Sequence, residues 1–217
     1  MTLRSSLTAR PWTPTAREEL PVSSRLAIPT ARLGLFVFMV VVTVLFTLLA
    51  SAYLMRMTMP DWRPLSEPPV LWANSMFLLL SSLALYVTSV AFRRGRPKVA
   101  IGGFLVGVAL AIAFLVGQML AWWQLGTLGY YLASNPANTF FYVLTTLHGL
   151  HLVGGLLALG WAAVRLGDGA NPMAARQSLD LCVLYWHFLL LIWVGLFALL
   201  LADNDGAIVM PGMNHTM

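Results

Sequence analysis

Five long apolar runs dominate the chain, and short polar segments connect them. Each run has 22–26 residues, and none contains an Asp, Glu, Lys or Arg. At a rise of about 1.5 Å per residue, about 20 helical residues cross a hydrocarbon core of about 30 Å. The pattern therefore predicts an all-α protein, an integral membrane bundle of five transmembrane helices. The helices are expected at residues 33–55, 70–92, 99–123, 139–164 and 181–202, which together make a membrane domain over 33–202.

Polar segments flank this membrane domain at both ends. Residues 1–32 contain four prolines and five arginines, with no apolar core ahead of a small-residue cleavage site, so they do not resemble a signal peptide. We expect an irregular N-terminal arm over 1–32 and an external C-terminal tail over 203–217. The tail carries Met210, Met213, His215 and Met217, side chains that suit Cu(I), although such a short tail is more often simply disordered.

The basic residues predict an orientation in the membrane. Eleven of the 13 Lys and Arg residues lie in the arm, in the segment after the second run or in the segment after the fourth run, and only Arg56 and Arg63 lie on the other side. Because basic loops stay in the cytoplasm, the N-terminus is expected inside and the C-terminus outside. The expected location is a bacterial inner (plasma) membrane, as a multi-pass protein.

Composition and charge exclude several classes of protein. The sequence is 59% hydrophobic and 10% charged, against about 25% charged residues in soluble domains, so its solvent must be lipid. The net charge of +5 does not indicate a nucleic-acid partner, because the basic residues border the apolar runs. The one cysteine, Cys182, excludes an internal disulfide. Ion pumps and proton-coupled transporters usually carry charged residues inside their membrane spans. The five runs contain no Asp, Glu, Lys or Arg, which disfavours both classes of protein.

Small residues recur at every fourth position in two of the runs. These residues are Gly103, Gly107 and Ala111 in the third run, and Gly154, Ala158 and Ala162 in the fourth. Such stripes allow helix backbones to approach closely in lipid. We therefore expect both stripes to lie at helix–helix contacts.

Three histidines lie inside the predicted spans and are the residues there that matter most for chemistry. His148 and His151 share one face of the fourth helix, and His187 lies on the fifth. One hypothesis is a shared metal or haem site, but His187 is expected at a different depth from the other two. The other hypothesis, which we favour, is that each neutral imidazole forms a hydrogen bond that holds the helices in register.

Sequence motifs in the fourth and fifth runs indicate a family. The fourth run contains Phe141-Tyr142, then His148-Gly149-Leu150-His151 and Gly154-Gly155; the fifth contains Tyr185-Trp186-His187-Phe188 and then Trp193. Earlier motifs are Arg32-x-Gly34 with Phe38, and Gly117-Gln118. In this order the motifs resemble cytochrome c oxidase subunit III, in its short five-helix form, over about residues 32–202.

The resemblance implies a non-catalytic subunit III of a membrane haem–copper terminal oxidase in aerobic respiration. Such a subunit holds no haem or copper, since these belong to its main partner, subunit I; subunit II and other small subunits complete the complex. It holds phospholipids in a helix cleft and supports proton uptake and stability during turnover. Arg32 and Arg165 match arginines that bind phospholipid phosphates in the family, although both could instead only orient their helices. The remaining motif residues are expected to be structural: Gly34, Gln118, His148, His151, Tyr185, Trp186 and His187.

The sequence departs from the family at three carboxylates. Val42, Ala121 and Leu190 stand where the family has a glutamate, a glutamate and an aspartate. Lipid binding and subunit packing survive this loss, whereas transfer of protons through these carboxylates does not. Three alternatives stay open from the sequence: a subunit-III-like component of a nitric oxide reductase, a haem- or copper-binding membrane protein that uses the three histidines, and, least favoured, a small transporter.

Overall fold

The computed structural model of the chain describes residues 30–63, 69–131, 135–167 and 172–204. These residues form five helices: α1 (Thr30–Met57), α2 (Val70–Arg93), α3 (Pro97–Thr127), α4 (Pro136–Gly167) and α5 (Pro172–Asn204). All five are long and apolar enough to cross a membrane. The prediction of an all-helical protein with five membrane-spanning helices is confirmed. The tail from residue 205 and the arm before residue 30 lie outside the described residues.

Most helices extend beyond the apolar runs that predicted them. α1 begins at Thr30. Residues 30–32, which we expected in the irregular arm, are therefore helical. α5 begins at Pro172, nine residues before the predicted start at 181. A helix satisfies its own backbone hydrogen bonds and so continues past the hydrocarbon core into the polar interface. Proline is favoured at the first helical position, and α3, α4 and α5 all begin with one.

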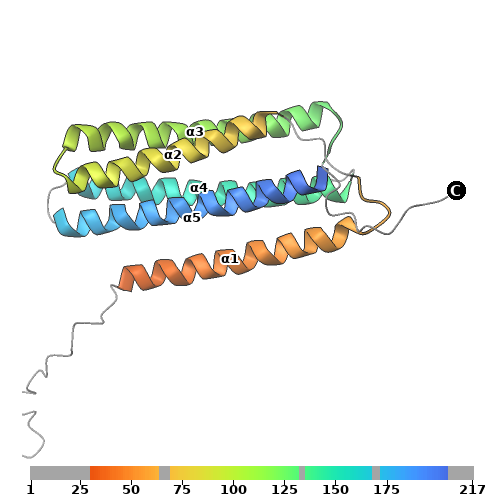
Figure 1. Cartoon of the computed structure of the whole chain (residues 1–217), viewed down its shortest axis with the longest axis horizontal. Coiled ribbons are helices and arrows are strands. Elements are labelled where there is room, and N and C mark those ends of the chain that lie inside the picture. The colour runs from red at the N-terminus through yellow and green to blue at the C-terminus, as the bar shows by residue number, and fades with distance from the viewer. Residues whose placement is uncertain (1–29, 64–68, 132–134, 168–171, 205–217) are drawn as a thin grey trace, which may run out of the picture.

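The helices form two antiparallel pairs with one helix at the edge (Figure 1). α2 packs most extensively on α3, α4 packs on α5, and α5 joins the pairs by packing on α2. Among the five described helices α1 contacts α5 and α4, and its buried residues are Val42, Phe46 and Tyr53. It lies farthest from its neighbours at the end where it begins (Figure 1).

The small-residue stripe of α3 lies against α2. A Cβ on Gly103 would lie 2.6 Å from Thr88 Oγ1 and 3.1 Å from the carbonyl oxygen of Ala84, and a Cβ on Gly107 would lie 2.8 Å from the Leu85 side chain. Neither position has room for a larger residue. Close packing of this stripe is confirmed.

The stripe of α4 has a different role from the one predicted. A Cβ on Gly154 would meet nothing within 4 Å, and Ala158 is exposed, so close packing is wrong for these two residues. The glycine that packs on α5 is Gly155, where a Cβ would lie 3.1 Å from the Trp186 ring and 3.2 Å from the Tyr185 ring. The four-residue spacing identifies one face of α4, but it does not show whether that face packs on another helix or stays open.

Buried tryptophans of α5 donate hydrogen bonds to serines of α2. Trp186 Nε1 donates to Ser81 Oγ at 3.1 Å, and Ser81 Oγ donates in turn to the carbonyl oxygen of Gly107 at 2.7 Å. Trp193 Nε1 donates to Ser75 Oγ at 2.9 Å. Because hydrocarbon offers no competing partner, these bonds set the register of α5 against α2 and α3.

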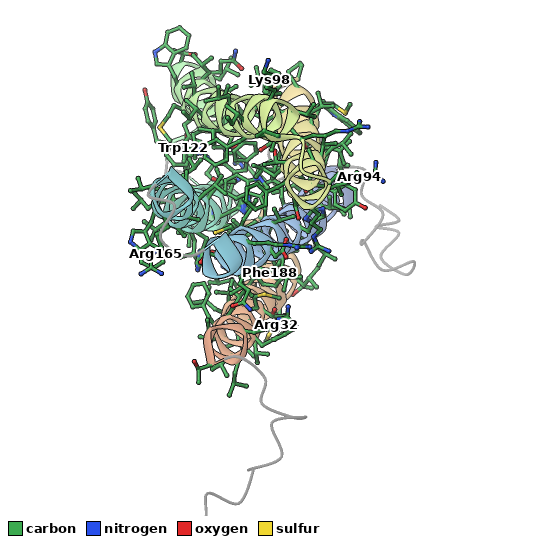
Figure 2. The ribbon with its side chains drawn as sticks, turned by 90° about the vertical axis from the view of Figure 1, so that its left-hand side faces the viewer. Arg32, Arg94, Lys98, Trp122, Arg165 and Phe188 are labelled. Carbon is green, nitrogen blue, oxygen red and sulfur yellow. The ribbon has the colours of Figure 1, made fainter. Side chains whose placement is uncertain are left out.

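Basic side chains gather at one end of the bundle, which we call the basic end. It is the end where α1, α3 and α5 begin, and Figure 2 views the bundle from this side. Its described basic residues are Arg32, Arg93, Arg94, Arg96, Lys98, Arg165 and Arg176. At the opposite end Arg56 Nη1 donates to Asp61 Oδ1 at 2.7 Å, and this hydrogen bond holds the pKa of Asp61 below its usual value.

Candidate functional site

Two adjoining hollows lie between α1, α4 and α5, and we call them together the α1–α4–α5 cleft. The larger is a cavity of about 510 Å³ and the smaller one of about 230 Å³. Leu35, Ala158 and Tyr185 line both. The larger extends along α4 past Gly154 to Leu150, and the smaller reaches Ala31 and Trp161 near the basic end. The α4 stripe therefore leaves space for the cleft, because Gly154 and Ala158 project little side chain into it.

Two polar groups on the wall of the cleft form hydrogen bonds to backbone carbonyls of α4. His151 Nδ1 donates to the carbonyl oxygen of Leu147 at 2.7 Å, and the Tyr185 hydroxyl donates to the carbonyl oxygen of His151 at 3.3 Å. The His151 ring also contacts Phe38 and Phe46 of α1, with centroids 6.1 and 5.7 Å apart. Such a wall suits a hydrocarbon chain better than a polar substrate.

Arg32 and Arg165 come from two of the three helices that bound the cleft, α1 and α4, and both lie at the basic end. Arg32 follows Ala31 in the first turn of α1, and Ala31 lines the smaller hollow. Arg165 lies in the last turn of α4, with Cζ 3.7 Å from the ring centroid of Trp161, which lines the same hollow. Figure 2 shows Arg94 and Lys98 projecting from other parts of this end.

The three membrane histidines face three different neighbours. His148 is fully buried, with its ring centroid 5.7 Å from Phe114 and 5.1 Å from Trp193. His151 faces α1, whereas His187 Nδ1 donates to the carbonyl oxygen of Val183 at 2.7 Å and its ring lies 6.2 Å from Tyr86. Among the described residues no group of three His, Cys, Asp or Glu side chains could hold a metal ion. The structure thus does not bring these histidines together as one site.

The other motif residues divide between core and surface. Trp186 is buried and bonded to Ser81, and Gln118 is buried and accepts a hydrogen bond at Oε1 from Asn74 Nδ2 at 3.4 Å. Gly34 lies on an open side of α1, where a Cβ would meet nothing within 4 Å.

The positions of the missing family carboxylates lie in apolar surroundings. Val42 is 3% exposed and lies one helical turn from both Phe38 and Phe46, the residues that contact His151. A carboxylate at this position would therefore lie close to His151. Ala121 is fully buried and Leu190 partly so. Apolar residues avoid the cost of burying a charge at these positions.

The contacts of two groups of polar residues were not predicted from the sequence. Asn74, Ser81 and Thr88 recur at seven-residue intervals in α2 and are all buried, a spacing that could have revealed the buried face of this helix. Asp180 Oδ1 accepts from Ser89 Oγ at 2.7 Å, and Asp180 Oδ2 lies 2.9 Å from Arg93 Nη2. These contacts join α5 to α2 near the basic end. No local sequence pattern predicts them.

Comparison with known proteins gives a consistent result. The family model described as cytochrome c oxidase subunit III matches residues 26–202. The chain is 33% identical over 175 residues to cytochrome c oxidase subunit 3 of Thermostichus vulcanus, covering 77% of this chain and 85% of that one. It is 32% identical over 174 residues to the protein of the same name from Synechocystis sp., covering 76% and 72%. A probable cytochrome c oxidase subunit 3 of Nocardia farcinica is 30% identical over 95 residues, covering 44% and 47%.

Proposed function

Because the chain belongs to the cytochrome c oxidase subunit III family, we propose that it is the non-catalytic subunit III of a haem–copper terminal oxidase in aerobic respiration. The observation that carries this proposal is the family match over residues 26–202, which includes all five membrane-spanning helices. In the proposal, haem and copper belong to subunit I, on which this chain packs. The complex lies in a bacterial plasma membrane with the basic end in the cytoplasm, as the distribution of arginines favours.

Affinity purification of the tagged chain from mildly solubilised membranes tests this function. We expect a haem- and copper-containing subunit I and a subunit II to co-purify, and the preparation to consume oxygen. A partner that reduces nitric oxide instead would support the nitric oxide reductase alternative. Stoichiometric haem on the isolated chain would contradict a non-catalytic role.

We further propose that the α1–α4–α5 cleft holds phospholipid. The cleft has a mostly apolar wall on which His151 Nδ1 and the Tyr185 hydroxyl are already bonded. Arg32 and Arg165 lie on its bounding helices at the basic end. Acyl chains would fill the hollows while a phosphate lies near the two guanidinium groups. Each basic group near an anionic headgroup contributes about 1 kcal/mol.

The double variant Arg32→Ala/Arg165→Ala tests the lipid site. Loss of about 2 kcal/mol corresponds to roughly 30-fold weaker retention of anionic phospholipid. We expect less tightly bound phospholipid by mass spectrometry of the purified oxidase and a shorter catalytic lifetime, with the initial rate nearly intact. Arg94→Ala/Lys98→Ala is the matched control, because it removes two cations from the same end away from the cleft. Unchanged lipid content in the first variant would contradict the proposal.

Support for proton uptake and turnover stability, in this proposal, comes from lipid and packing. Val42, Ala121 and Leu190 offer no proton-carrying group. Within the described spans the one carboxylate is that of Asp180, which is partly exposed. The chain would thus act by holding lipid and subunit I in place at the surface where protons enter, without relaying protons through carboxylates of its own.

A further inference from the structure

Polar atoms on three helices are buried in the middle of the bundle without a hydrogen-bond partner. Among the described residues they include Asn74 Oδ1 on α2, Gln118 Nε2 on α3 and both ring nitrogens of His148 on α4, and Ser82 Oγ on α2 is a further one. Asn74, Gln118 and His148 are at most 1% exposed. Buried polar groups in proteins almost always have a partner, and hydrocarbon supplies none.

The contacts of these residues place them in one region of the core. Asn74 and Gln118 are hydrogen-bonded to each other at 3.4 Å. Phe114, one turn before Gln118 on α3, contacts His148, and the Trp193 ring lies 4.8 Å from Phe114 and 5.1 Å from His148. Trp193 also donates to Ser75, the residue next to Asn74. The unpaired atoms thus share one set of surrounding residues.

The alignment of α3 with α4 supports the same grouping. Trp122 Nε1 on α3 donates to Thr145 Oγ1 on α4 at 3.1 Å. The two helices are antiparallel, so one turn toward the basic end Gln118 lies at the level of residues 148–149. His148 is therefore on the turn of α4 that faces Gln118.

The hydrogen bond between the two amides leaves one atom of each amide unpaired. With the present assignment, Asn74 Oδ1 and Gln118 Nε2 are left over. Exchanging the amide oxygen and nitrogen in both residues reverses the bond and leaves one donor and one acceptor again. In the observed geometry the two amides share one hydrogen bond and do not form a reciprocal pair, so one donor and one acceptor remain.

His148 also differs from the other two histidines. His151 and His187 each bond through Nδ1 to the carbonyl oxygen four residues earlier, at 2.7 Å. His148 makes no such bond, although it is the fully buried member of the three. A neutral imidazole presents one donor and one acceptor, which match the amide acceptor and donor left over on Asn74 and Gln118.

We propose that Asn74, Gln118 and His148 form an internal binding site for one or two water molecules. A water would accept from Gln118 Nε2, donate to Asn74 Oδ1 and link both to the imidazole. Buried waters typically make about three hydrogen bonds to otherwise unpaired groups, which is the number of side chains here. The site is separate from the lipid cleft and does not depend on the proposed function.

A structure of the intact complex at a resolution that shows ordered water tests the site directly. We expect density within hydrogen-bond distance, about 2.7–3.2 Å, of at least two of the three side chains. In the variant Gln118→Met that density should weaken or disappear. Direct hydrogen bonds from His148 to Asn74 or Gln118 with no water between them would overturn the proposal.

A double-mutant cycle gives a second test that does not depend on seeing water. His148→Phe and Gln118→Met should each lower the thermal midpoint of the purified complex by several degrees, because each leaves the remaining polar groups unpaired. If both residues bind the same water, the double variant should lose clearly less than the sum of the two. Additive losses would contradict a shared site. His187→Phe is the control, and its effect should add to that of Gln118→Met.

Discussion

Gly117 lies directly against the buried side chain of Asn74. A Cβ at this position would be 2.0 Å from Asn74 Oδ1 and 2.9 Å from Asn74 Cγ, far inside van der Waals contact. Asn74 is fully buried, so its amide has little room to move. At the residue scale, the Gly-Gln motif thus has two functions: the glycine admits the asparagine of α2, and the glutamine bonds to it.

The variant Gly117→Ala should therefore be destabilised. We expect a loss of about 1–3 kcal/mol, the usual cost of overpacking a core, measured as a lower thermal midpoint of the purified complex. Gly102→Ala on the same helix is the matched control, because a Cβ there meets nothing within 4 Å. Since alanine favours helix by up to about 1 kcal/mol over glycine, the control should be neutral or slightly stabilised. Equal effects in both variants would show that the close approach to Asn74 is unimportant.

At the scale of one element, α4 presents neighbouring residues to different surroundings. Gly155 packs against the Trp186 and Tyr185 rings, whereas Gly154 faces the open hollow. Successive residues of a helix point about 100° apart, so one helix can use one glycine for contact and the next for space. The helix therefore both joins the bundle and forms a wall of the cleft.

Filling the hollow from α4 should displace lipid without unfolding the chain. The variant Gly154→Leu places a side chain in the cavity of about 510 Å³, where a Cβ meets no atom. We expect normal assembly, fewer retained phospholipids by mass spectrometry, and a shorter catalytic lifetime. Gly160→Leu, also on an open side of α4 but outside the residues lining either hollow, should keep the wild-type lipid content. If Gly154→Leu also retained all its lipid, the larger hollow would not be the lipid site.

For the whole molecule, the outer face of α2 and α5 supports our proposal that the chain packs on subunit I. Tyr86 and His187 are exposed on this face, and the Ser89–Asp180–Arg93 group continues it toward the basic end. Exposed polar groups in a membrane span are costly in lipid and favour a protein partner. His187 lies about 200° around α5 from Tyr185, so this face is opposite the cleft.

Site-specific photo-crosslinking locates the partner on this face. With benzoylphenylalanine in place of His187, illumination of membranes should join the chain to subunit I, detected by gel shift and mass spectrometry. The same residue in place of Leu105, which is 60% exposed on α3, should not give that product. Crosslinking to subunit I from position 105 but not from 187 would place the interface on the other side of the bundle.

The sequence by itself determined the elements and the family. A membrane helix is recognised locally, because its backbone hydrogen bonds close within the segment and its length must match the hydrocarbon core. The motifs around His148, His151 and Tyr185 indicate the family without any information on the fold, and the comparisons bear this out. The predicted starts of α1 and α5 lie too late in the sequence. An apolar run ends where the hydrocarbon core ends, whereas the helix continues into the polar interface.

Only the tertiary structure decided which face of each helix packs on another helix and which face stays exposed. These helices are apolar on nearly all sides, because lipid and protein neighbours both accept apolar residues, so the sequence shows no face that must be buried. Spacing alone could not tell that Gly155 packs on α5 whereas Gly154 stays open. It also could not tell which of the three histidines is buried. The outward turn of His187, the contact of His151 with α1 and the enclosure of His148 all depend on how five helices pack together.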